Sequence, residues 1–446
     1  MPDNFNVTAP LTNLDNAGQY DLREMRLVLS GQSQAIDIRN LYTEFNIYED
    51  ILGNCISGNV TIIDSLNLLT RIGFSGNERL KIVVDTPTKG MPLDQEFLVY
   101  SVSPVYTNPK ENSKHSQLYV LNFCSPEKLL DLQFAVQKAY KSTPISQIVA
   151  DIMGSSYINT QKNVTIEETS GPQDLIIPNF HPLKAVDWLS TKAVSSKQNP
   201  DYIFFENRIG YFFMTLETLF TNAPSSVPQF IVDPKGYSQA ATDMPDIQRR
   251  LQTIKDYEIV NSPDTLKQTS QGVFASSLYT YDQMRRKFEI TPYSITQGFS
   301  GMSGPNGIKT PPYIPTSAGS ATYSAKSYYS PTNNGLNQTT YGKNDPGANN
   351  TLVEKYVGKR QSLLRGMQTY KIRVLLNGNL GLTVGNLVDL AFPNNDRKTA
   401  ADASSLSDVY SGRYLVSALR HQFSIKTHLT LIEVVRGSPE KGLGRV

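Results

Sequence analysis

The stretches GNERLKIVVDTP (76–87), EFLVYSVSPVY (96–106) and SQLYVLNFCSPE (116–127) decide the fold, because the chain repeats their pattern near its end. The later counterparts are GNLVDLAFPN (385–394), RYLVSALRHQF (413–423) and THLTLIEVVRGSPE (427–440). Apolar residues alternate with other residues between Gly-Asn and Pro punctuation, which is typical of antiparallel strands. The sequence therefore predicts one β fold that is used twice.

The two copies correspond position by position. The matched apolar positions are Leu98 with Leu415, Val99 with Val416, Val102 with Leu419, Tyr106 with Phe423, and the apolar stretch from Leu118 with that from Leu429. Two similar modules in one chain let a small oligomer imitate a larger ring. The duplication thus points to assembly rather than to chemistry.

The first quarter of the chain is rich in short strand patterns. The expected strands are Met25 to Leu29, Ile36 to Leu41, Phe45 to Tyr48, Gly58 to Ile63, Leu80 to Val84, Glu96 to Val102 and Gln117 to Phe123. No amphipathic helix interrupts them, which favours a barrel or a sandwich. The predicted fold class is mainly β (α+β), with two similar antiparallel β-barrel domains, an inserted α/β unit and a long irregular arm.

Helix signals begin after the first module. Ser125-Pro126-Glu127, Thr143-Pro144 and His181-Pro182 each place a proline at the first turn of an expected helix. The third helix carries an apolar stripe that includes Val186 and Leu189. An aromatic hairpin, residues 202–213, follows it. This region is predicted to be an α/β unit inserted between the two modules.

Residues 291–350 are dominated by Gly, Ser, Pro, Asn, Thr and Tyr and keep no apolar period. Such a stretch cannot bury enough apolar surface for a core of its own, so it is expected to be an irregular arm that orders on a partner. The predicted organisation is a flexible N-terminal arm (1–20), a first β domain (21–125), an inserted α/β domain (126–250), a second β domain (251–290 and 366–437), the Gly/Ser/Tyr-rich arm (291–350) and a connecting helix (351–365).

Composition excludes several functional classes. A net charge of +2, with 18% charged residues in a chain of 446, does not suit a nucleic-acid-binding module. The nearest basic groups, Arg249-Arg250 and Arg285 to Lys287, are interpreted as solvated faces. Cys55 and Cys124 are too few for a disulfide framework and indicate reduced thiols. No signal peptide or membrane-spanning run is found, so a soluble protein is expected.

No catalytic or metal-binding motif stands out. The histidines His115, His181, His421 and His428 have no metal-ligand spacing. The glycines of residues 298–304 lack the strand-to-helix context of a phosphate-binding loop. The sequence therefore predicts no catalytic residue, no cofactor and no metal.

Carboxylates are the residual enzymatic possibility, because a wall-degrading hydrolase needs only two. Glu167 and Glu168 are adjacent on an expected strand and would point to opposite faces, and Asp187 fits the polar side of its helix. The single tryptophan, Trp188, is expected to pack at the helix edge against the aromatic hairpin. The 24 tyrosines suit large protein–protein surfaces.

Three stretches together resemble the baseplate central hub proteins of contractile-tailed bacteriophages, which are similar to the hub half of type VI secretion spike proteins. They are NFHPLKAVDWLSTKAVS with YIFFENRIGYFFMTLETL, then QGVFASSLYTYDQMRRKFE, and finally SGRYLVSALRHQFSIKTHLTLIEVVR. Their order along the chain after residue 180 carries the match. The length of residues 291–350 departs from a minimal hub.

The resemblance implies a homotrimer with two tube-like β domains per subunit, which form a pseudo-sixfold ring. Such a ring adapts the hexameric tail tube, or a tube initiator, to a trimeric central spike. It encloses a channel through which genomic DNA passes without specific binding. The implied setting is the virion baseplate with its wedge proteins, assembled in the bacterial cytoplasm.

Two rival functions stay open at this point. A tail-associated cell-wall hydrolase would need a carboxylate pair about 5 to 9 Å apart in a cleft. A receptor-binding protein at the tail tip would show exposed aromatic clusters in residues 291–350.

Overall fold

The computed structural model describes most of the chain, with gaps in several loops. The described residues are 16–29, 35–66, 68–87, 92–107, 117–154, 156–221, 227–232, 246–282, 286–295, 326–332, 353–393, 407 and 409–437. The glycines of residues 298–304, His115 and most of the two predicted arms lie outside them.

The first module is a curled sheet of seven strands. They are β1 (Asp21–Val28), β2 (Ala35–Asp37), β3 (Tyr42–Asp50), β4 (Ser57–Asp64), β5 (Glu78–Asp85), β6 (Leu93–Thr107) and β7 (Gln117–Cys124). Their order in the sheet is β3-β4-β7-β6-β5-β1-β2, and the short helix α1 (Leu68–Ile72) follows β4. Alternate residues point inward, such as Val60 and Ile62 of β4, and they form one apolar core.

The second module is a closed barrel of six strands. They are β13 (Gln229–Val232), β14 (Thr253–Asn261), β18 (Tyr370–Asn377), β19 (Leu387–Ala391), β20 (Gly412–Ser424) and β21 (His428–Arg436). The order β19-β13-β14-β18-β21-β20 returns to its start because β19 also pairs with β20. A core that includes Val374, Leu390 and Ile432 fills the interior.

The predicted duplication is visible in the strand order. The first module reads β1-β5-β6-β7-β4-β3 and the second reads β13-β19-β20-β21-β18-β14, with the strands in the same sequence along the chain. Two β-bulges also correspond. The register shifts at Tyr42/Glu44 in β3 and at Ile254/Asp256 in β14. It shifts again at Val99/Ser101 in β6 and at Val416/Ala418 in β20.

The copies differ in two details. β1 pairs antiparallel with β5, whereas β13 pairs parallel with both β19 and β14. The expected match of Tyr106 with Phe423 is wrong by one residue. In the first copy Ser103 pairs with Val120 and the next pair is Tyr106 with Leu118, so β6 contains a further irregularity at Pro104 that β20 lacks. Proline has no N–H to continue a ladder, which accounts for the irregularity at this point.

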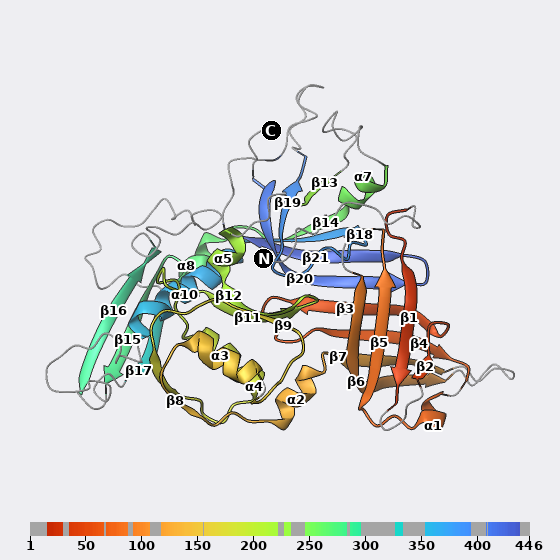
Figure 1. The fold of residues 1–446 in the computed structure, drawn as a ribbon. Coiled ribbons are helices and arrows are strands. Elements are labelled where there is room, and N and C mark those ends of the chain that lie inside the picture. The colour runs from red at the N-terminus through yellow and green to blue at the C-terminus, as the bar shows by residue number, and fades with distance from the viewer. Residues whose placement is uncertain are drawn as a thin grey trace, which may run out of the picture.

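The inserted α/β unit lies between the modules in sequence. Its elements are α2 (Glu127–Gln133), β8 (Ala139–Thr143), α3 (Ile145–Met153), β9 (Asn163–Ile166), β10 (Gln173–Ile176), α4 (Pro182–Ser190), β11 (Tyr202–Asn207), β12 (Gly210–Thr215) and α5 (Leu216–Thr221). α3 and α4 cover the β9-β12-β11 sheet, and Val186 and Leu189 are fully buried among its aromatic residues (Figure 1). The predicted helical stripe is therefore a core.

Two expected boundaries need correction. β13 was assigned to the inserted unit, yet it belongs to the second module, because Phe230 fills the barrel core and the strand closes the gap between β14 and β19. Residues 251–290 were assigned to the second module, yet only β14 joins it, and the helices α7 (Asp246–Gln252) and α8 (Thr265–Ser270) flank that strand.

A separate sheet accounts for the remaining residues of that range. It consists of β15 (Ala275–Asp282), β16 (Lys287–Ser294) and β17 (Lys326–Thr332), in the order β16-β15-β17. β17 lies within the segment expected to be irregular. The sheet packs on the connecting helix α10 (Val353–Met367), because Leu278, Val353 and Tyr356 form a small core of their own.

Candidate functional site

The two modules meet at a strand joint, which we define as the antiparallel pairing of Glu44–Asp50 in β3 with Ala418–Ser424 in β20. The joint makes both modules part of one sheet of 13 strands (Figure 1). On its apolar face Phe45 and Phe423 stack with ring centroids 4.3 Å apart and planes 8° apart. Both rings are fully buried.

The opposite face of the strand joint is polar. Arg420 of β20 donates from Nε to the side-chain oxygen of Asn46 over 2.9 Å, and its Nη2 lies 3.3 Å from a Glu44 carboxylate oxygen. Its guanidinium also lies over the ring of Tyr48, 5.8 Å from the centroid. The register of the joint is thus held by stacking on one face and by Arg420 on the other.

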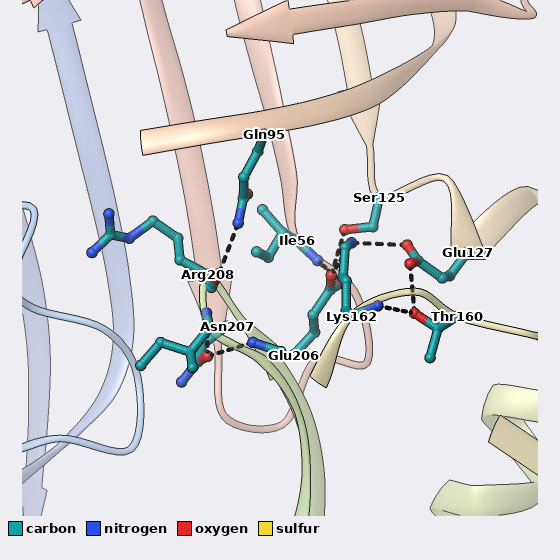
Figure 2. A network of polar contacts seen from close by, with 11 residues as sticks. Ile56, Gln95, Ser125, Glu127, Thr160, Lys162, Glu206, Asn207 and Arg208 are labelled. Carbon is teal, nitrogen blue, oxygen red and sulfur yellow. Dashed lines mark hydrogen bonds and ion pairs between the residues drawn. The ribbon is translucent and has the colours of Figure 1, made fainter. Parts of the chain in front are cut away.

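The inserted unit is attached through a buried polar junction, which we define as Glu206, Lys162, Glu127, Ser125 and the Ile56 amide (Figure 2). Glu206 accepts from the Ile56 amide over 2.8 Å, from the Ser125 hydroxyl over 2.9 Å and from Lys162 Nζ over 2.6 Å. Lys162 Nζ also donates to Glu127 over 2.8 Å. One carboxylate therefore joins β11 to the end of β7 and to the start of β4.

The polar junction contains two carboxylates and one lysine, which pairs with both. Burial raises the pKa of Glu206, and Lys162 and Ser125 oppose this shift. Burial alone would lower the pKa of Lys162, but Glu206 and Glu127 together raise it. The lysine is therefore charged, and it compensates the buried Glu206.

A second buried pair, Arg208 with Glu49, lies where all three parts of the chain meet. Arg208 Nε is 3.9 Å from a Glu49 oxygen, and the other Glu49 oxygen accepts from the Val384 amide over 3.0 Å. Gln95 donates to the Arg208 carbonyl over 2.9 Å, and Asn207 donates to the Val384 carbonyl over 3.2 Å (Figure 2). Burial raises the pKa of Glu49 to about 7, against the effect of Arg208.

His421 and His428 form a buried pair in the second module. His421 Nδ1 lies 3.2 Å from His428 Nε2 and 3.2 Å from the Thr430 hydroxyl. Burial lowers the pKa of both rings, to about 3 for His428, so both are neutral. His181 is on the surface, where Nδ1 lies 3.0 Å from the Phe134 carbonyl. No group of three metal-ligating side chains occurs among the described residues.

Glu167, Glu168 and Asp187, the carboxylates weighed for a hydrolase, all lie in the inserted unit. Glu167 accepts from the Thr215 amide over 2.8 Å, and it therefore fixes the start of α5. At Glu168, the main-chain carbonyl accepts from the Tyr202 hydroxyl over 2.7 Å. Asp187 is on α4, where burial raises its pKa and Arg360 opposes the shift. These groups serve the packing of the inserted unit.

Trp188 packs edge-on against Phe180, with ring centroids 5.7 Å apart, and it is partly buried against the core that contains the aromatic residues of the predicted hairpin. The basic groups also separate. Arg249 and Arg250 lie on α7, whereas Lys287 begins β16 and pairs with Glu289. Within the described ranges no helix is long and apolar enough to cross a membrane.

Two strand edges that lack a neighbour among the described residues are the counterparts of the strand joint. β5 pairs with β6 only as far as Val99, which leaves one edge of residues 101–107 without a neighbour. β13 pairs with β14 only at Thr253 and Ile254, which leaves one edge of residues 255–261 open. Open edges offer N–H and C=O groups to another strand.

The β16-β15-β17 sheet exposes an aromatic face. Tyr329 is 77% exposed and stacks on Tyr279, with ring centroids 5.0 Å apart. Phe288 lies 5.9 Å from the same Tyr279 ring, and Tyr281 and Ile290 are also exposed. The β16-β15-β17 sheet lies apart from both modules (Figure 1).

No protein-family model and no curated protein matches the sequence. Among solved structures, a tail protein from Neisseria meningitidis MC58 matches over 94% of this chain and 97% of its own, with a TM-score of 0.52 and 11% identity. A prophage MuSo2 43 kDa tail protein from Shewanella oneidensis gives a TM-score of 0.49 at 10% identity, over 93% of this chain and 98% of its own. An Escherichia coli type VI secretion component gives 0.43 at 8% identity, over 94% and 79%. The chain thus has the fold of the Neisseria tail protein along nearly its whole length.

Proposed function

We propose that this protein is the structural hub of a contractile-tail baseplate, and that it is not an enzyme. The observation that carries the proposal is the duplicated β module, whose copies are already joined edge to edge within one chain. The fold shared with a phage-type tail protein supports the same setting, the virion tail. The carboxylates of the polar junction are occupied by structural donors, which also speaks for a scaffold.

The mechanism of the proposed hub is symmetry matching. Three subunits with two modules each present six similar units to a sixfold tail tube or tube initiator. The inserted unit occurs once per subunit, so it keeps the threefold symmetry that a trimeric central spike needs. A head-to-tail contact between different surfaces closes into a ring when its rotation fits. Baseplate wedge proteins would contact the outside of this ring.

Genomic DNA would pass through the ring without being held. A net charge of +2 and a charged fraction of 18% provide little of the concentrated positive charge that grips phosphates. A genome that has to slide past the hub needs such a weakly charged lining. This proposal predicts no measurable DNA affinity at physiological salt.

The decisive experiment is the mass of the full-length protein in solution, measured by analytical ultracentrifugation over a range of concentrations. The proposal predicts three times the chain mass of 49.6 kDa. Low-resolution particle images should then show a ring with six similar lobes. A monomer at every concentration, or a twofold particle, would contradict the hub function.

A second candidate function rests on the exposed aromatic face of the β16-β15-β17 sheet. Large apolar faces on a folded subunit usually mark a binding surface. This favours a receptor-binding role at the tail tip as the alternative. Tyr329→Ser should then abolish attachment to host cells while purified particles keep a normal baseplate. Defective baseplate assembly in the same variant would assign the face to the hub function instead.

A further inference from the structure

We propose that β14 of one subunit pairs antiparallel with β6 of a second copy of this chain, with Asn261 opposite Ser103. We call this contact the subunit seam. The inference rests on the proposed ring-forming function and specifies the surface that forms the ring. It uses the two open strand edges described above and the register of the strand joint.

The first step is the equivalence of strands. The shared bulges align β3 with β14, so that Phe45 corresponds to Tyr257 and Ile47 to Ile259. The other pair of bulges aligns β20 with β6, so that Arg420 corresponds to Ser103. The joint between β3 and β20 therefore has one counterpart, between β14 and β6.

The second step is the register. In the strand joint, Ala418 faces Asp50 and Arg420 faces Tyr48. β14 contains a further bulge at Val260, between Ile259 and Asn261, that β3 lacks, so Asn261 is the counterpart of Tyr48. The same pairing transferred to the counterpart strands therefore places Ser103 opposite Asn261 and Ser101 opposite Pro263. Beyond Ser103 the irregularity at Pro104 shifts β6 by one residue, so the transferred register applies to residues 101–103.

The third step is burial. Phe45 and Ile47 are fully buried because β20 covers their edge. Their counterparts Tyr257 and Ile259 are each 39% exposed. An apolar position that is buried in one copy and exposed in the other marks a surface that lacks its neighbour. Among the described residues of one chain, β6 does not pair with β14, so we infer that the neighbour comes from a second copy.

The seam differs chemically from the joint. Ser103 replaces Arg420, so β6 offers no guanidinium to the acidic residues Asp256 and Glu258, which correspond to Glu44 and Asn46. Glu258 is instead 3.5 Å from Arg373 of its own module. The seam therefore relies on main-chain hydrogen bonds and apolar contact. Its stability should depend little on salt concentration, because no ion pair crosses it.

Cysteine cross-linking of the full-length protein tests the register. Cα atoms that face each other in an antiparallel pair are about 4.5 to 5.5 Å apart, which a disulfide can bridge. Oxidation of the double variant Ser103→Cys/Asn261→Cys should give covalent trimers on a non-reducing gel. The variant Ser101→Cys/Asn261→Cys, displaced by two residues, should not cross-link. Arg420→Cys/Tyr48→Cys should cross-link within one chain only.

A charge variant provides an independent readout. Ile259→Arg should convert the trimer to folded monomers with an unchanged circular dichroism spectrum, because the residue is 39% exposed in the single subunit. Leu266→Arg on α8, at a position that is 85% exposed, is the matched control and should stay trimeric.

The results of these experiments distinguish a failure of the proposed subunit seam from a failure of the proposed hub function. A trimer that neither forms the cross-link between positions 103 and 261 nor dissociates with Ile259→Arg overturns the seam and leaves the hub function standing. A wild-type protein that is monomeric at every concentration overturns both.

Discussion

Removal of the positive charge from the polar junction should destabilise the attachment of the inserted unit. In Lys162→Met, Glu206 keeps two neutral donors, the Ile56 amide and the Ser125 hydroxyl, and loses its counter-charge. Removing one partner of a buried ion pair costs about 3 to 5 kcal/mol. The Lys162 side chain is 26% exposed, so we expect the lower end, about 3 kcal/mol of unfolding free energy.

Urea titration at pH 8 measures this loss with two probes. Trp188, the single tryptophan, reports on the inserted unit by fluorescence, and circular dichroism reports on the β modules. The matched control is Arg79→Met, which breaks an exposed pair with Glu96 and should cost less than about 1 kcal/mol.

The pH dependence of Lys162→Met follows from the sign of the Glu206 shift. Without the lysine, the pKa of Glu206 in the folded state rises further above its unfolded value. The variant should therefore recover stability as the pH falls toward 5 and Glu206 takes up a proton. A loss below about 0.5 kcal/mol at pH 8, or no recovery at pH 5, would refute the claim that Lys162 compensates Glu206.

Three further changes test other parts of the fold. Val186→Asp should destabilise the inserted unit by about 3 kcal/mol or more, because it buries an unpaired charge. A urea unfolding curve of Trp188 fluorescence close to that of the wild type would contradict the packing described. Gly58→Ala would place a Cβ atom 2.2 Å from Phe123 and 2.3 Å from the Asn46 carbonyl, so its melting temperature should fall by several degrees, corresponding to about 2 kcal/mol. The pKa of Glu49 in the folded state is raised to about 7, so its contribution to the stability of the wild type falls as the pH rises from about 4.5 to 7. The stability of Glu49→Gln relative to wild type should therefore rise over that range, by on the order of 2 to 3 kcal/mol. A difference that does not change with pH would contradict a buried Glu49.

The duplication could be predicted from the sequence because it rests on local alternation. Strands such as β7 and β21 bury every second residue, and that period survives in any single copy. β13 was missed because a strand of four residues is too short to show an apolar alternation. Its position between β14 and β19 is visible only in the folded barrel. β17 was missed because its segment is rich in serine and has no apolar period. Its tyrosine Tyr328 packs against the core formed with α10, which lies later in the chain.

The polar junction was missed for a different reason. Glu206 is a carboxylate in the middle of the aromatic strand β11, and a charge at a buried strand position is a signal that it needs a partner. The sequence shows that need but does not identify Lys162, Ser125 or Ile56 as the partners. The hydrogen bond from Lys162 to Glu206 spans 44 positions of the chain, and that from the Ile56 amide to Glu206 spans 150 positions. Such contacts follow from the tertiary fold alone.

The strand joint also orders events during synthesis on the ribosome. β3 emerges early, but the strand that covers its edge begins at Gly412, so most of the chain has to be translated before the first module is complete. Contacts such as that between Asn46 and Arg420 span 374 positions and form late. Until then the edge of β3 can recruit other nascent chains, and chaperones would have to shield it. Truncated translation products lack β20, so quality control could recognise them by this uncovered edge before they enter a baseplate.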